Sequence, residues 1–160
     1  MKIFYTCPSD RMAIRLHHQF GTQISCYQNL GGLFNFKQSI WADSLYLECA
    51  SQPVKEIYFV GSLQNRFVKS VLENEVGYGS SAEQEFARLY IQHFDNFDAF
   101  QSLQEKQLYL MMSAYKKQRQ EIMEHHVLRD IIQQNTINIG ALILMNNELY
   151  RFELLETVKR

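Results

Sequence analysis

Between Gly79 and Gly140 the chain contains neither glycine nor proline. These two residues disfavour a helix interior by about 1 and about 3 kcal/mol respectively. The segment is instead rich in Glu, Gln, Lys, Leu and Met, and its apolar residues recur at helical spacing. The sequence therefore predicts that most of residues 81–134 is helical and that residues 86–115 contain no strand.

The chain also lacks an excess of basic residues, long apolar runs and paired cysteine motifs. The 16 basic residues do not exceed the 17 acidic ones, which argues against a protein that binds duplex nucleic acid. This balance does not exclude a local basic patch. No apolar run approaches the roughly 20 residues that span a bilayer, so we expect no membrane contact. The three cysteines have no CxxC spacing and are interpreted as free thiols in a reducing compartment. The free thiols predict a cytoplasmic protein, and the compact length of the chain suggests a bacterial or phage origin.

Apolar and aromatic residues are abundant enough to build a core, at 46% and 13% of the chain. Apolar, β-favouring runs predict strands at residues 3–7, 24–27, 33–36, 44–49 and 54–60. Two asparagines, Asn146 and Asn147, separate two further runs and predict a hairpin turn, because Asn tolerates positive φ. The predicted fold class is α+β, with a small, mostly antiparallel sheet and a long helical segment between its two parts. We expect one domain over residues 1–160, formed by an α/β part (1–79), a helical part (80–136) and a terminal hairpin (137–160).

An apolar stripe begins near residue 97 and continues to about residue 131, interrupted only by Gln118. An unbroken helix of this length would measure roughly 50 Å at 1.5 Å per residue. The alternative is two helices hinged at residues 116–120. Because an overlong apolar helix needs a cover, we expect it to bind a protein partner or a second copy of the chain. The predicted binding residues are Leu108, Met111, Tyr115, Lys116, Lys117, Arg119 and Ile122.

One candidate for chemistry is Cys7, which ends the first predicted strand just before a helix capped by Ser9 or Asp10. A helix N-terminus lowers the pKa of a thiol and favours the nucleophilic thiolate. Residues 1–16 resemble the opening strand and helix of glutathione transferases, which implies thiol-dependent transfer. The alternative interpretation is a buried structural cysteine.

A second candidate is Arg119 with His125 or His126, six and seven positions further along the same predicted helix. This spacing resembles the Arg-x4–6-His signature of HEPN ribonucleases. The resemblance implies metal-independent RNA cleavage, in which Arg stabilises phosphate charge and His moves a proton. The alternative is a solvated helix face, because Arg11 and His17 show the same spacing by chance.

No motif specifies a metal or a cofactor, and an HExxH run is absent. We therefore expect no cofactor, no obligatory metal and no catalytic residue. The leading interpretation is a non-enzymatic interaction protein of the immunity, antitoxin, inhibitor or adaptor type that presents its long helix to a partner. The alternative is a small enzyme, either a HEPN-like ribonuclease or a glutathione-transferase-like protein.

Overall fold

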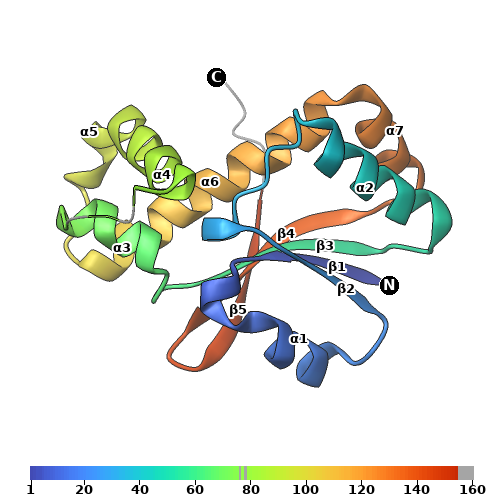
Figure 1. Cartoon of the computed structure of the whole chain (residues 1–160), viewed down its shortest axis with the longest axis horizontal. Helices are drawn as coiled ribbons and strands as arrows, with labels where there is room; N and C mark the ends of the chain where they lie inside the picture. The colour runs from blue at the N-terminus through green and yellow to red at the C-terminus, as the bar shows by residue number, and fades with distance from the viewer. Residues whose placement is uncertain (76, 78, 155–160) are drawn as a thin grey trace.

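A computed structural model describes residues 1–75, 77 and 79–154. Its centre is a five-stranded sheet in the order β2-β1-β3-β4-β5 (Figure 1). The strands are β1 (Lys2–Thr6), β2 (Ile24–Gln28), β3 (Glu56–Ser62), β4 (Asn138–Met145) and β5 (Glu148–Glu153). The first four strands of this order are parallel, and only β5 runs antiparallel to its neighbour. The chain is therefore an α/β protein.

The prediction of a mostly antiparallel sheet is wrong. Parallel neighbours must be joined by crossover segments, usually helices, and the structure has a helical crossover after each of the first three strands. The helix α1 (Met12–Phe20) joins β1 to β2, α2 (Ser39–Ser51) joins β2 to β3, and the long helical segment joins β3 to β4.

Two of the predicted strands do not exist in the structure. Residues 44–49 lie within α2, where Ala42, Leu45 and Cys49 are buried at helical spacing. Residues 33–36 are not assigned to any helix or strand, although Phe34 and Phe36 are buried. Both segments are apolar because they pack against the core, and apolar content was mistaken for a strand signal.

The helical prediction for residues 81–134 is confirmed. The segment holds α4 (Ser81–Gln92), α5 (Phe94–Phe97), α6 (Leu103–Glu124) and α7 (His126–Gln134), and no strand. Ser80 and Ser102 each form a capping box with the glutamate three residues on. At 22 residues, α6 is roughly 33 Å long. It continues through residues 116–120 and ends before His125, so the hinge lies at that residue.

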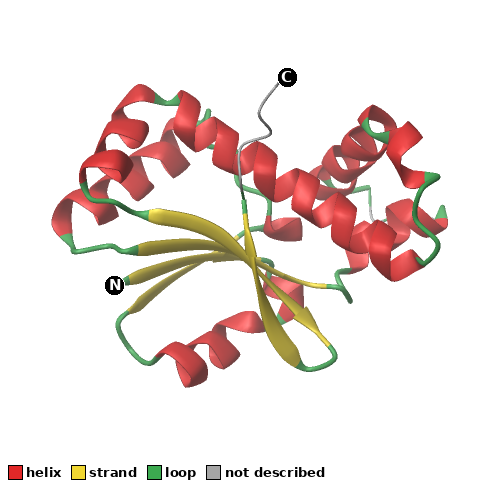
Figure 2. Ribbon diagram, turned by 180° about the vertical axis from the view of Figure 1, so that it is seen from behind, coloured by secondary structure: helices red, strands yellow, loops and turns green. Residues whose placement is uncertain are grey.

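The two faces of the sheet are covered unequally (Figure 2). One face packs against α2, α4, α6, α7 and α3 (Arg66–Glu73) through the larger apolar cluster, to which Ile3, Tyr5, Ile57 and Phe59 contribute from the strands. The other face packs against α1, through a small cluster that includes Met12 and Leu16. No described helix is both long and apolar enough to cross a membrane.

The predicted hairpin at Asn146 and Asn147 is confirmed. Both residues have positive φ, 50° and 65°, and they join β4 to β5. The carbonyl oxygen of Asn147 also accepts a hydrogen bond from Arg15 Nη1 at 2.8 Å, which ties the turn to α1. β4 pairs with β3 and so joins the sheet of the N-terminal half, and β5 forms the edge.

Candidate functional site

The strand order contains one switch point, between β1 and β3. From β1 the chain continues to β2 on one side, and from β3 it continues to β4 on the other side. In open α/β sheets, ligands bind in the crevice outside the carboxyl ends of the strands at such a point. The segments that follow β1 and β3 are therefore the first place to look for a site.

At this point the strand-end cluster, formed by Cys7, Ser9, Asp10, Ser62 and Asn65, joins the two segments. Asp10 Oδ2 accepts hydrogen bonds from the Ser62 backbone N–H at 3.2 Å and from the Asn65 side-chain amide at 3.3 Å. Burial raises the pKa of the Asp10 carboxyl, and the hydrogen bonds from Asn65, Ser9 and Ser62 oppose that rise. Asp10 thus acts as a link between two loops.

Cys7 lies fully buried in the same cluster. Its Sγ accepts a hydrogen bond from the Gly31 N–H at 3.2 Å and lies 3.0 Å from Ser9 Oγ. The Ser9 hydroxyl donates its single proton to Asp10 Oδ1, so the Cys7 thiol donates to Ser9. The side chain predicted as a nucleophile is a buried, hydrogen-bonded thiol without access to solvent.

Two side chains from α6 fill the crevice in front of the strand-end cluster. A Cβ atom at Gly61 would collide with the side-chain ends of Tyr115 and Met111, so a larger residue there would force these buried side chains to move. Burial raises the pKa of Tyr115 well above its usual value. Met111 and Tyr115, predicted to bind a partner, lie in the core of this chain.

A cavity of about 350 Å³ lies beside this crevice, between α4, α6 and the segment from β2 to the start of α2. Its apolar wall includes Leu30, Leu33, Phe34, Trp41 and Leu89, and its polar wall includes Asn29, Asn35, Glu85, Lys117, Gln118 and Glu121. Binding cavities of small organic molecules typically have about 300–1,000 Å³, apolar walls and a few fixed polar groups. We call this space the α4–α6 cavity.

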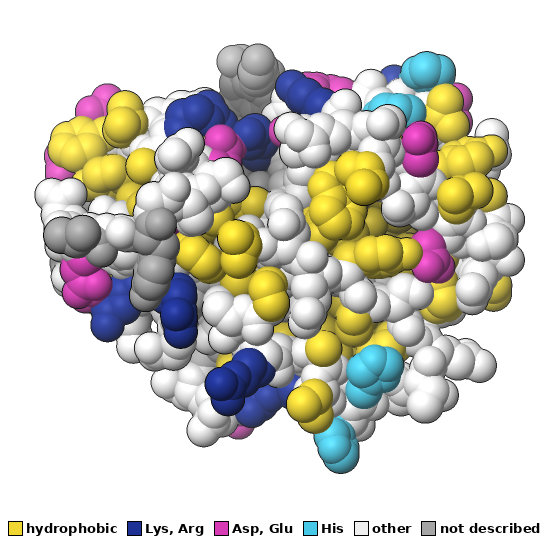
Figure 3. Space-filling view, viewed as in Figure 1, with side chains coloured by type: hydrophobic (Ala, Val, Ile, Leu, Met, Phe, Trp, Pro, Cys, Tyr) yellow, Lys and Arg dark blue, Asp and Glu magenta, His cyan; other side chains and the backbone are white. Residues whose placement is uncertain are grey.

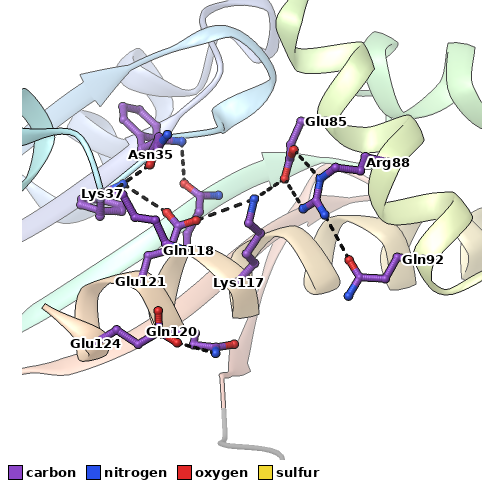
Figure 4. A network of polar contacts seen from close by, with 12 residues as sticks. Asn35, Lys37, Glu85, Arg88, Gln92, Lys117, Gln118, Gln120, Glu121 and Glu124 are labelled. Carbon is purple, nitrogen blue, oxygen red and sulfur yellow. Dashed lines mark hydrogen bonds and ion pairs between the residues drawn. The ribbon is translucent and has the colours of Figure 1, made fainter.

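Lys117 is the central charge of the polar wall (Figure 4). From α6 it reaches Glu85 on α4, and its Nζ lies 3.7 Å from Glu121 Oε1, one turn further along α6. The i,i+4 pairing of Lys117 with Glu121 agrees with the sequence pattern. Arg88 binds both carboxylate oxygens of Glu85, at 2.9 and 3.0 Å. This hydrogen bonding by Arg88, followed by that of Lys117, lowers the pKa of Glu85 to about 2.

Two further side chains of α6 hold the segment that covers the cavity. Gln118 Oε1 accepts a hydrogen bond from the Phe34 N–H at 2.7 Å, and Gln118 Nε2 donates to the Gly32 carbonyl at 3.3 Å. Glu121 Oε2 accepts from the Phe36 N–H at 3.2 Å. Because these backbone groups have side-chain partners instead of a neighbouring strand, the segment stays extended without joining the sheet.

The other residues predicted to act in binding or catalysis are dispersed. Arg119 lines a second cavity of about 520 Å³ between α6, α7, β4 and β5, and His125 is not among its lining residues. His125 Nδ1 is buried and has no hydrogen-bond partner among the described residues. Leu108 packs partly buried against the core, Ile122 is fully buried, and Lys116 is exposed.

Sequence reasoning missed most of the α4–α6 cavity. Lys117 was predicted to bind a protein partner and not to pair with Glu85. Two signals could have indicated the site. Gln118 is a polar interruption in an otherwise apolar stripe, and Trp41 is the single tryptophan of the chain. Neither signal shows which distant elements come together.

No protein-family model matches the chain, and no curated protein sequence matches it. Solved structures of β-carbonic anhydrases, however, have the same fold. The enzyme CafA of Aspergillus fumigatus superposes with a TM-score of 0.80 at 15% identity, over 97% of this chain and 76% of its own. A tetrameric enzyme of Sordaria macrospora gives 0.77 at 12% identity, over 94% and 79%. The Coccomyxa enzyme in complex with acetazolamide gives 0.70 at 10% identity, over 93% and 70%.

These neighbours correct the functional prediction. Each of the three is named as a β-carbonic anhydrase, which is an enzyme. The prediction of a non-enzymatic protein-interaction protein of the immunity, antitoxin, inhibitor or adaptor type, and of a phage protein, is therefore wrong. The alternative resemblances fail as well, because a sheet of this order is unlike the wholly helical HEPN domain, and the buried Cys7 does not offer a transferase nucleophile. At these identities the likeness establishes the fold alone.

The fold implies zinc, since carbonic anhydrases work through a zinc-bound hydroxide. A zinc site needs three or four Cys, His or carboxylate ligands around one point. Within residues 1–75, 77 and 79–154, no three His, Cys, Asp or Glu side chains converge in this way. At the switch point, Cys7 and Asp10 are accompanied by Ser62 and Asn65, which are neutral and hydrogen-bonded to Asp10 or its loop. The described residues do not fit a zinc site.

Proposed function

We propose that this protein uses the carbonic-anhydrase fold to bind a small organic molecule in the α4–α6 cavity, without metal chemistry. The observation that carries the proposal is a lining that combines aromatic and aliphatic side chains with the ion-paired Lys117. Such a combination is typical of binding sites, where apolar contact supplies affinity and a few polar groups fix orientation.

The polar wall is also held in place before any ligand arrives. Gln118 and Glu121 are both at most 7% exposed and hydrogen-bonded to the covering segment. Lys117 is fixed by Glu85, which Arg88 holds with two hydrogen bonds. Pre-organisation of this kind reduces the entropic cost of binding.

The test uses saturation-transfer NMR with four probes: L-phenylalanine, phenethylamine, phenylacetate and benzamide. Ser81 lies exposed at the rim of the cavity, and Ser81→Phe should fill the entrance. Gln84→Phe, exposed on the same helix but not lining the cavity, is the matched control. We expect at least one probe to bind the wild type and Gln84→Phe but not Ser81→Phe. Equal binding by Ser81→Phe, or no binding by any probe, would overturn the proposal.

We also propose that the chain self-associates, as the tetrameric Sordaria enzyme does. The supporting observation is a group of hydrophobic side chains over α2 on the helical face (Figure 3), where Ile40 and Leu47 are 64% and 63% exposed. Light scattering after size exclusion should give a mass above that of one chain, and Leu47→Lys should lower it. A monomeric wild type would refute self-association.

A further inference from the structure

Lys117 and Glu121 form an ion pair but no hydrogen bond with each other. The distance from Lys117 Nζ to Glu121 Oε1 is 3.7 Å, too long for a hydrogen bond. Glu121 Oε2 accepts a hydrogen bond from the Phe36 N–H, and Oε1 accepts none from a described residue. The pair therefore leaves one acceptor unused, on a side chain that is only 7% exposed.

Lys117, in turn, has more hydrogen-bond donors than its contacts with the described residues use. An ammonium group carries three donors, and among the described residues Lys117 hydrogen-bonds only to Glu85. Glu85 is also a carboxylate, so it accepts hydrogen bonds from Arg88 and Lys117 and has none to donate to Glu121. Side by side on the cavity wall, Lys117 thus offers donors and Glu121 offers an acceptor.

A ligand that satisfies both groups needs an anionic acceptor and a cationic donor on neighbouring atoms. The head group of a free α-amino acid has this arrangement, with a carboxylate for Lys117 and an ammonium for Glu121. A ligand with a carboxylate alone would bring a second negative charge next to Glu121 and offer Glu121 no donor. A ligand with an amine alone would bring a second positive charge next to Lys117 and offer Lys117 no acceptor. Because burial makes an unpaired charge costly, a ligand with both charges is favoured.

The apolar part of the cavity lining defines the rest of the ligand. Leu33, Phe34 and Trp41 face a space of about 350 Å³ together with Leu30 and Leu89. Such a wall suits an aliphatic or aromatic side chain and offers no partner to a charged one. We infer that the α4–α6 cavity binds a free α-amino acid with an apolar side chain, through Lys117 and Glu121.

This inference rests on the proposed function, and its test separates the two. Trp41 is the single tryptophan and lines the cavity, so its fluorescence reports occupancy directly. We would titrate L-phenylalanine, L-leucine, phenylacetate and phenethylamine. The expected result is that the two amino acids bind at least tenfold more tightly than phenylacetate and phenethylamine.

Variants test the two head-group contacts. Glu121→Gln keeps an acceptor for the Phe36 N–H but removes the charge, and Lys117→Met removes the donors; Lys116→Met, exposed on the same helix, is the control. Both cavity variants should lose the preference for the amino acids at least tenfold, with thermal unfolding confirming that they fold. If phenylacetate or phenethylamine binds as tightly as L-phenylalanine, the head-group inference fails and the cavity remains a binding site. If no probe changes Trp41 emission in the wild type, the inference and the proposed function fail together.

Discussion

The Gln118 side chain and the Phe34 backbone are joined by a 2.7 Å hydrogen bond across 84 residues of sequence. Through it, a polar residue on the buried side of α6 supplies the partner that a neighbouring strand would otherwise give to Phe34. The interruption of the stripe is thus a structural requirement of the segment that covers the cavity.

Replacing Gln118 by Leu should leave the Phe34 N–H and the Gly32 carbonyl buried without partners. Each such loss costs about 1–3 kcal/mol, and we expect the free energy of unfolding to fall by about 2 kcal/mol or more in urea denaturation. Gln120→Leu, two residues further on the exposed side, should change it by less than about 0.5 kcal/mol. Equal effects of the two substitutions would show that the bond to Phe34 contributes little.

Glu85 should make stability depend on acid pH. Its pKa in the folded protein is lowered from 4.5 to about 2, first by the hydrogen bonds of Arg88. A lowered pKa means that the stabilisation is fully present above pH 4.5 and is lost as the pH falls toward about 2. The difference in unfolding free energy between wild type and Glu85→Gln should shrink over this range, whereas Glu75→Gln, at an exposed position, should show no such trend. A difference that is constant with pH would contradict the role of Arg88 and Lys117.

The donor set at the switch point predicts that zinc is not retained. After incubation with zinc and desalting, elemental analysis should find far less than one zinc ion per chain. Addition of a chelator should leave the unfolding midpoint unchanged, because the Asp10 link needs no metal. One tightly held zinc ion per chain, lost in Cys7→Ser or Asp10→Asn, would show that the cluster is a metal site after all.

The hairpin turn should depend on positive φ at Asn147, which is 65°. A β-branched residue is strained there by about 1–2 kcal/mol, so Asn147→Val should lower the unfolding free energy by that amount. Asn147→Gly should be neutral or slightly stabilising, since Gly is favoured in this type of turn. Chemical denaturation of the two variants provides the comparison, and a Val variant as stable as the Gly variant would rule out strain at this turn.

The features that the sequence predicted are those with local causes. The lack of helix breakers and the Asn146–Asn147 turn act within a few residues, and the structure bears out both. The predicted cap at Ser9 or Asp10 is wrong, because α1 begins after Arg11 and no side chain caps it. Strand partners are not local, since β3 pairs with β1 on one side and with β4 on the other. The parallel order therefore could not be read from the apolar runs.

The site was harder to predict than the fold for the same reason. Trp41, Glu85 and Lys117 come from three helices and line one cavity only when α2, α4 and α6 pack together. Exposure also misled the prediction. The stripe of Met111, Tyr115 and Ile122 was expected to need an external partner, but the sheet itself covers it.

The long helical excursion between β3 and β4 has a consequence for the order in which the chain acquires its structure. The units β1–α1–β2 and α2–β3 close short loops, whereas β4 can pair with β3 only after all of α3 to α7 has been traversed. Closing a longer loop costs more entropy and slows folding. We therefore expect the amides of β4 and β5 to gain protection later than those of β1 and β3 in pulse-labelling hydrogen exchange. Simultaneous protection of all five strands would instead indicate that the sheet and its helical cover form in one step.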